Sequence, residues 1–191
     1  MAFFAGSIPF GWIIGKILGI DLRQVGSGNI GAANTLRTLG FFPAFLTFSF
    51  DFIKGFLPVY FSRAFPMDVR SLVCLAGVLG HDFSPFLKFK GGKGVATSFG
   101  GIFALDWKIG VIVLLSWLVV FAIFRIPSVA SLSSLGISTI VSIFLGGGFF
   151  LVTLILFGLC LIRHRKNIEK LKSGEEKPIR LTGRGQDGDG I

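Results

Sequence analysis

The sequence predicts an all-α integral membrane protein with about seven transmembrane helices, some of them short. The 191-residue chain is 52% hydrophobic, contains 23 Phe residues and has a mean hydropathy of +0.77. Soluble domains of this length are rarely so apolar. Several apolar runs also approach the roughly 20 residues that a helix needs to cross a bilayer. We expect one transmembrane domain over residues 1–172 and a disordered tail over 173–191, where glycine and charge dominate.

The apolar runs place the expected helices one by one. The first run begins at the initial Met and lacks the charged segment that opens a cleaved signal peptide, so we interpret it as a helix. It leads directly into a glycine-rich loop. The clearest runs predict helices over residues 2–20, 41–61, 69–81, 109–124, 128–145 and 149–162.

One further run, residues 95–105, is too short to cross a membrane by itself. It rises about 17 Å as a helix, against roughly 30 Å of hydrocarbon, so it either starts below the membrane surface or is re-entrant. Counting it as a span places fourteen Lys and Arg residues on one side and three on the other. A model with six spans would place eleven Lys and Arg residues on one side and six on the other. The positive-inside rule therefore favours seven spans, with the N-terminus outside and the C-terminus in the cytoplasm.

A loop of small residues and donors follows the first helix. Its glycines free the backbone to approach a ligand, and its polar side chains suit an anion such as phosphate. The alternative is a flexible connection between helices. The glycines also spell G-x-G-x-x-G, but an apolar helix precedes them, which excludes a dinucleotide fold. The loop contributes Gly26, Ser27, Gly28, Asn29, Gly31, Asn34 and Arg37.

A second candidate anion site is the sequence Lys90-Gly91-Gly92-Lys93. Two lysines around a glycine pair make a suitable cradle for a phosphate. The alternative is an ordinary positively charged cytoplasmic loop. The pattern is not a Walker P-loop, because the required glycine and the Ser or Thr after the lysine are missing.

Other polar residues lie inside or at the ends of the apolar runs. Asp51 and Lys54 share one helix face, and we expect the pair to face the protein interior, for function or for structure alone. Ser128 and Ser131 share a face at a helix start, where capping is the usual role of serine. His164 and Asn167 repeat this spacing, and His164 would act as base, donor or phosphate partner, or simply be a hydrated interfacial histidine.

Three blocks of the sequence resemble the signature motifs of the bacterial acyl-phosphate:glycerol-3-phosphate acyltransferases, the PlsY type. They are Gly-Ser-Gly-Asn-Ile-Gly-Ala-Ala-Asn from residue 26, Phe-Lys-Gly-Gly-Lys-Gly-Val-Ala-Thr from residue 89, and His-Arg-Lys-Asn-Ile-Glu-Lys-Leu from residue 164. The resemblance extends in order from about Ala5 to Glu175. The chain departs from the family in a shorter first run, in Ala33 where Thr is common, and in Lys166 where an acidic residue is common.

The resemblance implies transfer of an acyl chain from acyl phosphate to the 1-hydroxyl of glycerol 3-phosphate, without a cofactor or metal. The products would be lysophosphatidic acid and inorganic phosphate, in the first step of phospholipid biosynthesis. The site would lie at the cytoplasmic face of the bacterial inner membrane. Partners would be both substrates, membrane lipids and, functionally, an enzyme that forms acyl phosphate. The net charge of +9 then reflects membrane orientation and not nucleic-acid binding.

The expected roles follow from the motifs. We hypothesise direct attack by the acceptor hydroxyl without an acyl-enzyme, and the alternative function is a small transporter of a phosphorylated solute. Catalysis is expected from Ser27, Asn34, Lys93 and His164. Substrate binding is expected from Gly26, Gly28, Asn29, Gly31, Arg37, Lys90, Gly91, Gly92, Ser128, Ser131 and Asn167, with support from Asp51, Lys54 and His81.

Overall fold

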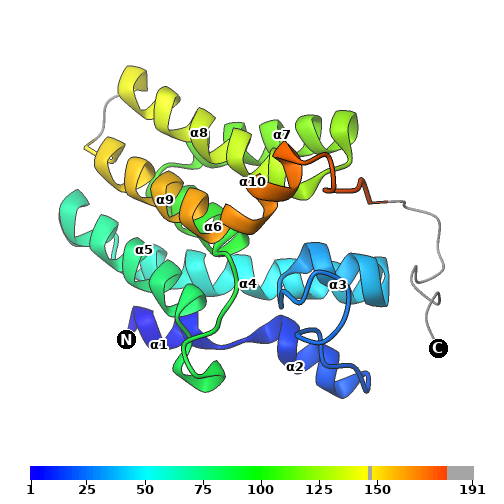
Figure 1. Cartoon of the computed structure of the whole chain (residues 1–191). Coiled ribbons are helices and arrows are strands. Elements are labelled where there is room, and N and C mark those ends of the chain that lie inside the picture. The colour runs from blue at the N-terminus through cyan, green and yellow to red at the C-terminus, as the bar shows by residue number, and fades with distance from the viewer. Residues whose placement is uncertain (146–147, 180–191) are drawn as a thin grey trace, which may run out of the picture.

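The computed structural model describes residues 1–145 and 148–179, and every regular element in these residues is helical (Figure 1). The predicted all-α class is therefore confirmed. The chain forms ten α-helices and one 3₁₀ turn within these residues. They are α1 (Ala2–Ser7), α2 (Phe10–Ile17), α3 (Ala32–Leu39), α4 (Phe41–Phe61), α5 (Met67–Asp82), η1 (Pro85–Leu87), α6 (Val95–Leu105), α7 (Trp107–Phe124), α8 (Pro127–Leu145), α9 (Phe150–Arg163) and α10 (Arg165–Lys172).

The apolar helices form a layered bundle. In Figure 1, α4 and α5 run between the α1–α2 pair on one side and a layer of α7, α8 and α9 on the other, with α6 packed among them. Helices α4, α7 and α8 are long and apolar enough to cross a membrane, whereas α6 and α9 are shorter apolar helices. The 11-residue α6 has the bounds that the sequence predicts. Which end of the bundle faces the cytoplasm stays a prediction.

The first apolar run is not one helix, as we expected, but two. Helix α1 stops at Ser7, and α2 starts after Pro9, whose ring removes a backbone N–H and interrupts the helical bonding. The carbonyl groups freed by this break lie in an apolar region and need donors. Lys54 Nζ donates to the carbonyl oxygen of Ile8 at 2.6 Å, and Ser84 Oγ donates to that of Ser7 at 2.6 Å. The break is therefore stabilised by side chains from other segments.

This arrangement explains the charges inside α4. Lys54 Nζ lies 2.6 Å from Asp51 Oδ1, and both side chains are buried, as the sequence predicts. His81 Nδ1 lies 3.7 Å from the same carboxylate oxygen. A buried lysine is tolerated where an acid and a carbonyl oxygen surround it. The pair thus has a structural task at the α1–α2 break.

Close backbone contacts join helices that are far apart in the sequence. A Cβ atom on Gly6 of α1 would lie 2.0 Å from the carbonyl oxygen of Gly77 in α5, and one on Gly55 of α4 would lie 2.1 Å from that of Thr97 in α6. Within membranes, small residues let helices approach closely enough for van der Waals contact to hold them together. These glycines fix how α5 and α6 sit in the bundle, and the loop between these two helices contributes to the site described below.

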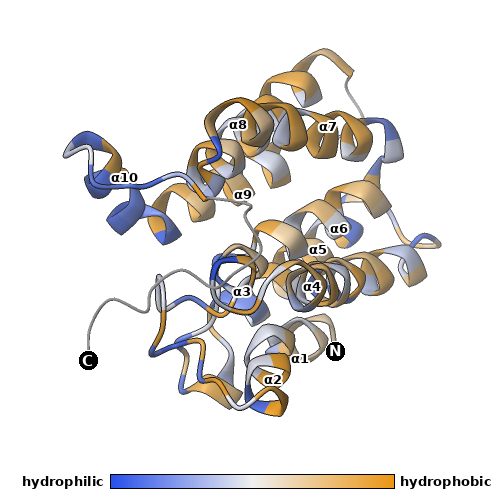
Figure 2. Cartoon of the chain, turned by 90° about the vertical axis from the view of Figure 1, so that its right-hand side faces the viewer, coloured by the Kyte–Doolittle hydropathy of each residue, from blue (hydrophilic) through white to orange (hydrophobic). Residues whose placement is uncertain are grey.

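Polar residues gather at one end of the bundle. Viewed from that end, Figure 2 shows hydrophilic segments at α3, at α10 and in the loop before α3, while most of the other helices are hydrophobic. Residues 173–179, which we expected to be disordered, fold back there. The N–H of Ile179 donates to the carbonyl oxygen of Arg125 at 2.8 Å, and Ile179 itself is buried. The rest of the predicted tail lies outside the described residues.

Candidate active site

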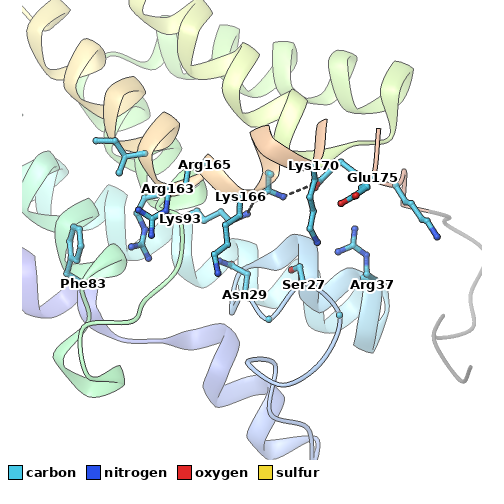
Figure 3. Close-up of a pocket in the computed structure, with 16 residues that line it drawn as sticks. Ser27, Asn29, Arg37, Phe83, Lys93, Arg163, Arg165, Lys166, Lys170 and Glu175 are labelled. Atoms are coloured by element: carbon cyan, nitrogen blue, oxygen red, sulfur yellow. Dashed lines mark hydrogen bonds between the residues drawn. The ribbon is translucent and has the colours of Figure 1, made fainter. Parts of the chain in front are cut away.

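A cavity of about 770 Å³ opens at the polar end of the bundle. Its size suits a small-molecule ligand. Three of the segments that the sequence singles out line it together: the glycine loop, the loop before α6 and the chain after α9 (Figure 3). Its lining residues are Gly26, Ser27, Gly28, Asn29, Arg37, Phe83, Lys93, Ile162, Arg163, Arg165, Lys166, Asn167, Lys170, Glu175, Glu176 and Lys177.

Asn34 organises the glycine loop from beneath. Its side-chain oxygen accepts a hydrogen bond from the N–H of Ser27 at 2.8 Å, and its amide nitrogen donates to the carbonyl oxygens of Leu22, Val25 and Asn29 at 2.8–3.1 Å. Gly26 has φ +58, a conformation that favours glycine. Asn34 is only 1% exposed and does not line the cavity. The structure thus gives it the task of shaping the loop, and the catalytic role that we expected for it stays a prediction.

The outer part of the loop faces the cavity. Ser27 and Asn29 line it, and Arg37 reaches it from the last turn of α3. The side-chain oxygen of Asn29 accepts from the N–H of Gly31 at 2.8 Å, which shapes the entry into α3. Figure 3 shows Ser27, Asn29 and Arg37 on the same side of the cavity. A hydroxyl, an amide and a guanidinium are therefore available together for an anion.

The backbone N–H groups of the Gly91–Gly92 pair point away from the cavity, so the binding role that we expected for these glycines stays a prediction. The N–H of Gly91 donates to the carbonyl oxygen of Asp82 at 3.2 Å, and that of Gly92 donates to the backbone carbonyl oxygen of His81 at 3.1 Å. The two glycine carbonyl oxygens accept from the guanidinium of Arg163. The peptide N–H groups are thus committed to the end of α5. Neither glycine lines the cavity.

Glycine is required at these positions for space. A Cβ atom on Gly91 would lie 2.0 Å from the carbonyl oxygen of His81, and one on Gly92 would lie 2.0 Å from His81 Nε2. His81 is 5% exposed and lies directly behind the loop. This position fits the supporting role that the sequence suggests for His81. Lys90 is exposed and does not line the cavity, so only the second lysine of the motif reaches it.

Lys93 and Asn167 meet at the cavity wall. Lys93 Nζ donates to Asn167 Oδ1, while Asn167 Nδ2 donates to Glu176 Oε1 at 2.6 Å. Burial lowers the pKa of Lys93 to about 8, partly opposed by the negative charge of Glu176. A lysine of this pKa still carries a positive charge in much of the population near neutral pH. It can therefore attract an anion and respond to pH close to the physiological range.

His164 lies just past the end of α9 and is 3% exposed, so the alternative of a hydrated interfacial histidine is wrong. Its Nδ1 is 2.9 Å from the carbonyl oxygen of Cys160, which can only accept, so Nδ1 carries the proton. Burial lowers the pKa of His164 to about 4, and the nearby positive charge of Lys93 acts in the same direction. The imidazole is therefore neutral at pH 7. It does not line the cavity.

The two serines of α8 do not act as simple helix caps. Ser128 Oγ donates to Glu176 Oε1 at 3.2 Å, and Ser131 Oγ donates to the carbonyl oxygen of Pro127 at 2.7 Å while accepting from Trp117 Nε1. Neither serine lines the cavity. Ser128 is nevertheless connected to it, because Glu176 joins it to Asn167.

Sequence reasoning missed several lining residues. Arg163 is not among the residues that the sequence predicts for the site, and Glu176 lies in the segment that it predicts to be disordered. These residues reach the cavity because the chain folds back over it after α9, and a pattern in the sequence does not reveal this return. Ile162 ends a predicted apolar run and Phe83 lies just after another, and neither is predicted to line a site, although both form an apolar side of the cavity.

The arrangement combines many cations with a small apolar wall. The cationic groups of Arg37, Lys93, Arg163 and Lys166 face a common space, and among the described residues the acids that line it are Glu175 and Glu176. Such a cavity suits a ligand with anionic groups at one end and hydrocarbon at the other.

Comparison with known proteins agrees with this chemistry. A family model described as glycerol-3-phosphate acyltransferase matches residues 1–174. The glycerol-3-phosphate acyltransferase of Thermotoga petrophila is 44% identical over 185 residues, covering 95% of this chain and 94% of the relative. The glycerol-3-phosphate acyltransferase of Aquifex aeolicus is 41% identical over 181 residues, covering 92% of this chain and 94% of the relative.

Two solved structures have the same fold. Both are of PlsY (YgiH), an integral membrane glycerol 3-phosphate acyltransferase, and each match covers 94% of this chain and 92% of the solved one. The glycerol 3-phosphate form superposes with a TM-score of 0.91 at 38% identity. The lysophosphatidic acid form superposes with a TM-score of 0.88 at 37% identity.

Proposed function

The chain belongs to the glycerol-3-phosphate acyltransferase family, and we propose that it uses acyl phosphate to acylate the 1-hydroxyl of sn-glycerol 3-phosphate. The products would be lysophosphatidic acid and inorganic phosphate. The observation that carries the proposal is the single cavity in which Ser27 and Arg37 face Lys93 and Asn167. Both substrates carry a phosphate, and this cavity offers donors on two opposing sides.

We assign the donor phosphate to the glycine loop. Ser27 and Asn29 present short polar side chains there, and Arg37 adds a charge with fork geometry that matches phosphate. Lys93 and Asn167, on the opposite side, would hold the acceptor. The assignment puts one anion near each set of donors and leaves the reacting groups between them.

The acyl chain would leave the cavity along its apolar side. Phe83 follows α5 and Ile162 belongs to the last turn of α9, and both line the cavity. They are partly exposed, at 38% and 63%, on a bundle whose surface is otherwise rich in large apolar side chains. A hydrocarbon chain placed between them would stay in contact with lipid while its phosphate remains at the polar end.

The reaction would be a direct transfer. The acceptor hydroxyl oxygen attacks the carbonyl carbon of the mixed anhydride, a new ester C–O bond forms, and the C–O bond to the phosphate breaks. The hydroxyl proton ends on the released phosphate. Because acyl phosphate already has a good leaving group, orientation and charge stabilisation suffice, and Lys93 would stabilise the charge that develops. His164, neutral and held through Nδ1, would position the acceptor indirectly, from behind the cavity wall, without acting as base.

This function also fits the membrane setting. Acyl phosphate is amphiphilic and must be supplied by an enzyme that forms it, and we place the cavity at the cytoplasmic face of a bacterial inner membrane because the basic loops gather at that end.

The test is an assay of the purified protein with both substrates. We expect phosphate release that requires acyl phosphate and glycerol 3-phosphate together, with lysophosphatidic acid formed in equal amount. Acyl-CoA in place of acyl phosphate should give no product. Uptake of glycerol 3-phosphate into proteoliposomes without phosphate release would instead identify a transporter and contradict the proposal.

A further inference from the structure

The peptide groups of Gly91 and Gly92 are hydrogen-bonded on both edges. Their N–H groups donate to the carbonyl oxygens of Asp82 and His81 at the end of α5. Their carbonyl oxygens accept from one side chain, that of Arg163: Nη2 donates to Gly91 at 3.1 Å and to Gly92 at 2.7 Å, and Nε donates to Gly92 at 3.1 Å. The loop is therefore held between α5 and the end of α9.

Two of these three bonds hold the carbonyl oxygen of Gly92, and Lys93 is the next residue in the chain. The carbonyl group of Gly92 belongs to the same planar peptide unit as the N–H of Lys93. Fixing the Gly92 oxygen from two guanidinium nitrogens fixes the plane to which the Cα atom of Lys93 is attached. The direction in which the Lys93 side chain leaves the backbone thus depends on Arg163.

Arg163 is itself held in place. It is the last residue of α9, and its guanidinium lies 5.2 Å from the ring centroid of Phe83, which follows α5. This cation–π contact helps to hold the guanidinium in place, and its planar fork meets both carbonyl oxygens. An ammonium group has neither the plane nor the spacing for this arrangement. Figure 3 shows Arg163 beside Lys93 and on the same side as Phe83.

We propose that Arg163 is a positioning residue for the acyl transfer: its guanidinium grips the Gly91 and Gly92 carbonyl oxygens and thereby aims Lys93 at Asn167 and the cavity. This inference rests on the proposed function only for the consequence in activity. The grip on the loop is a separate property of the fold that can be measured without turnover.

The first measurement is hydrogen exchange of the loop amides in the absence of substrate. In Arg163→Ala, the amides of Gly91 and Gly92 should exchange faster than in the parent protein, because the carbonyl side of the pair is released. Lys172→Ala, an exposed cation at the end of α10, is the matched control and should leave the loop unchanged. Unchanged loop exchange in Arg163→Ala would overturn the proposal, even if activity fell, since a direct substrate ligand gives that result.

The second measurement is chemical rescue of the acyl transfer. Misplacing a charged group by about 1 Å costs roughly 100-fold in rate, so Arg163→Ala should lose about that factor in kcat/KM. Guanidinium at millimolar concentration should raise the kcat/KM of Arg163→Ala several-fold, whereas methylammonium should not. Arg163→Lys should stay close to the alanine variant, because one ammonium cannot replace the fork. Full activity in Arg163→Lys would overturn the proposal.

The two measurements separate the possible failures. If the parent protein shows no phosphate release from acyl phosphate and glycerol 3-phosphate, the proposed function is wrong, and loop exchange still decides whether Arg163 holds the loop. If the parent is active and both loop exchange and kcat/KM are unchanged in Arg163→Ala, only the positioning role is wrong.

Discussion

The ammonium of Lys93 donates a hydrogen bond to the side-chain oxygen of Asn167, a residue 74 positions further along the chain. The contact joins two of the three sequence motifs, and the third lies across the same cavity. Motifs that are separate in sequence therefore form one site.

Lys93→Ala should reduce kcat/KM by about 100- to 1000-fold, because a cation aimed at developing charge contributes this much. The variant should remain folded in detergent, as judged by size exclusion and thermal unfolding. Lys88→Ala is the control, since Lys88 is exposed and outside the cavity, and it should behave like the parent. Unchanged turnover with both substrates in Lys93→Ala would show that the cation assignment is wrong.

The pH–rate profile should report Lys93. Its pKa is lowered to about 8, and the protonated form is the active one, so activity should be present below pH 8 and fall as the pH rises through 8. Lys93→Arg keeps the charge at all these pH values and should move the alkaline limb upward, whatever its absolute rate. If the limb stays at the same pH in Lys93→Arg, another group is responsible for it.

His164→Ala should raise the KM for glycerol 3-phosphate more than it lowers kcat, because the neutral imidazole supports the acceptor side of the cavity from behind its wall. With a pKa lowered to about 4, His164 does not titrate between pH 5.5 and 7.5, so the profile of the parent should be flat there on its account. A severe loss of kcat together with the disappearance of an acidic limb would identify His164 as the general base.

Ser27 should never carry the acyl chain. Mixing the protein with acyl phosphate alone, quenching and analysing the intact mass should show no adduct. Ser27→Ala should weaken use of the donor, because a hydroxyl at the cavity is lost. Ser173→Ala, which removes an exposed serine outside the cavity, serves as the control. An acylated Ser27 would contradict direct transfer and make this residue the nucleophile.

The topology is tested by labelling. Cysteines introduced at Ser27 and Ser173, in a background without Cys74 and Cys160, should react with a membrane-impermeant maleimide only from the cytoplasmic side. The reason is the strong excess of basic residues in the connections at that end. Labelling of either cysteine from outside would overturn the seven-span orientation.

Much of this architecture can be predicted because bilayer thickness sets the length of the apolar runs and the distribution of Lys and Arg indicates the topology. The bounds of α4 and α6 match the runs that predict them. The break at Pro9 is harder to foresee, since it depends on Lys54 and Ser84, which reach it from distant segments.

At the site, too, the sequence does not reveal contacts between distant segments. The types of residue in the glycine loop indicate an anion, but only the structure shows that Asn34 shapes the loop while Ser27 faces the cavity. The Gly91–Gly92 pair suggests donors, whereas its donors are turned toward α5. Composition identifies which groups are present, and the direction in which each one points is decided by tertiary contacts.

The break between α1 and α2 also constrains the order in which parts of the protein fold. The carbonyl oxygen of Ile8 accepts from Lys54 in addition to the N–H of Phe10, and that of Ser7 accepts from Ser84. Both donors follow α1 and α2 in the chain, 46 residues after Ile8 and 77 residues after Ser7. The N-terminal segment therefore acquires its final shape only after α4 and α5 have entered the bilayer. Until then, the carbonyl oxygen of Ser7 needs another donor, such as water, and that of Ile8 has only the N–H of Phe10.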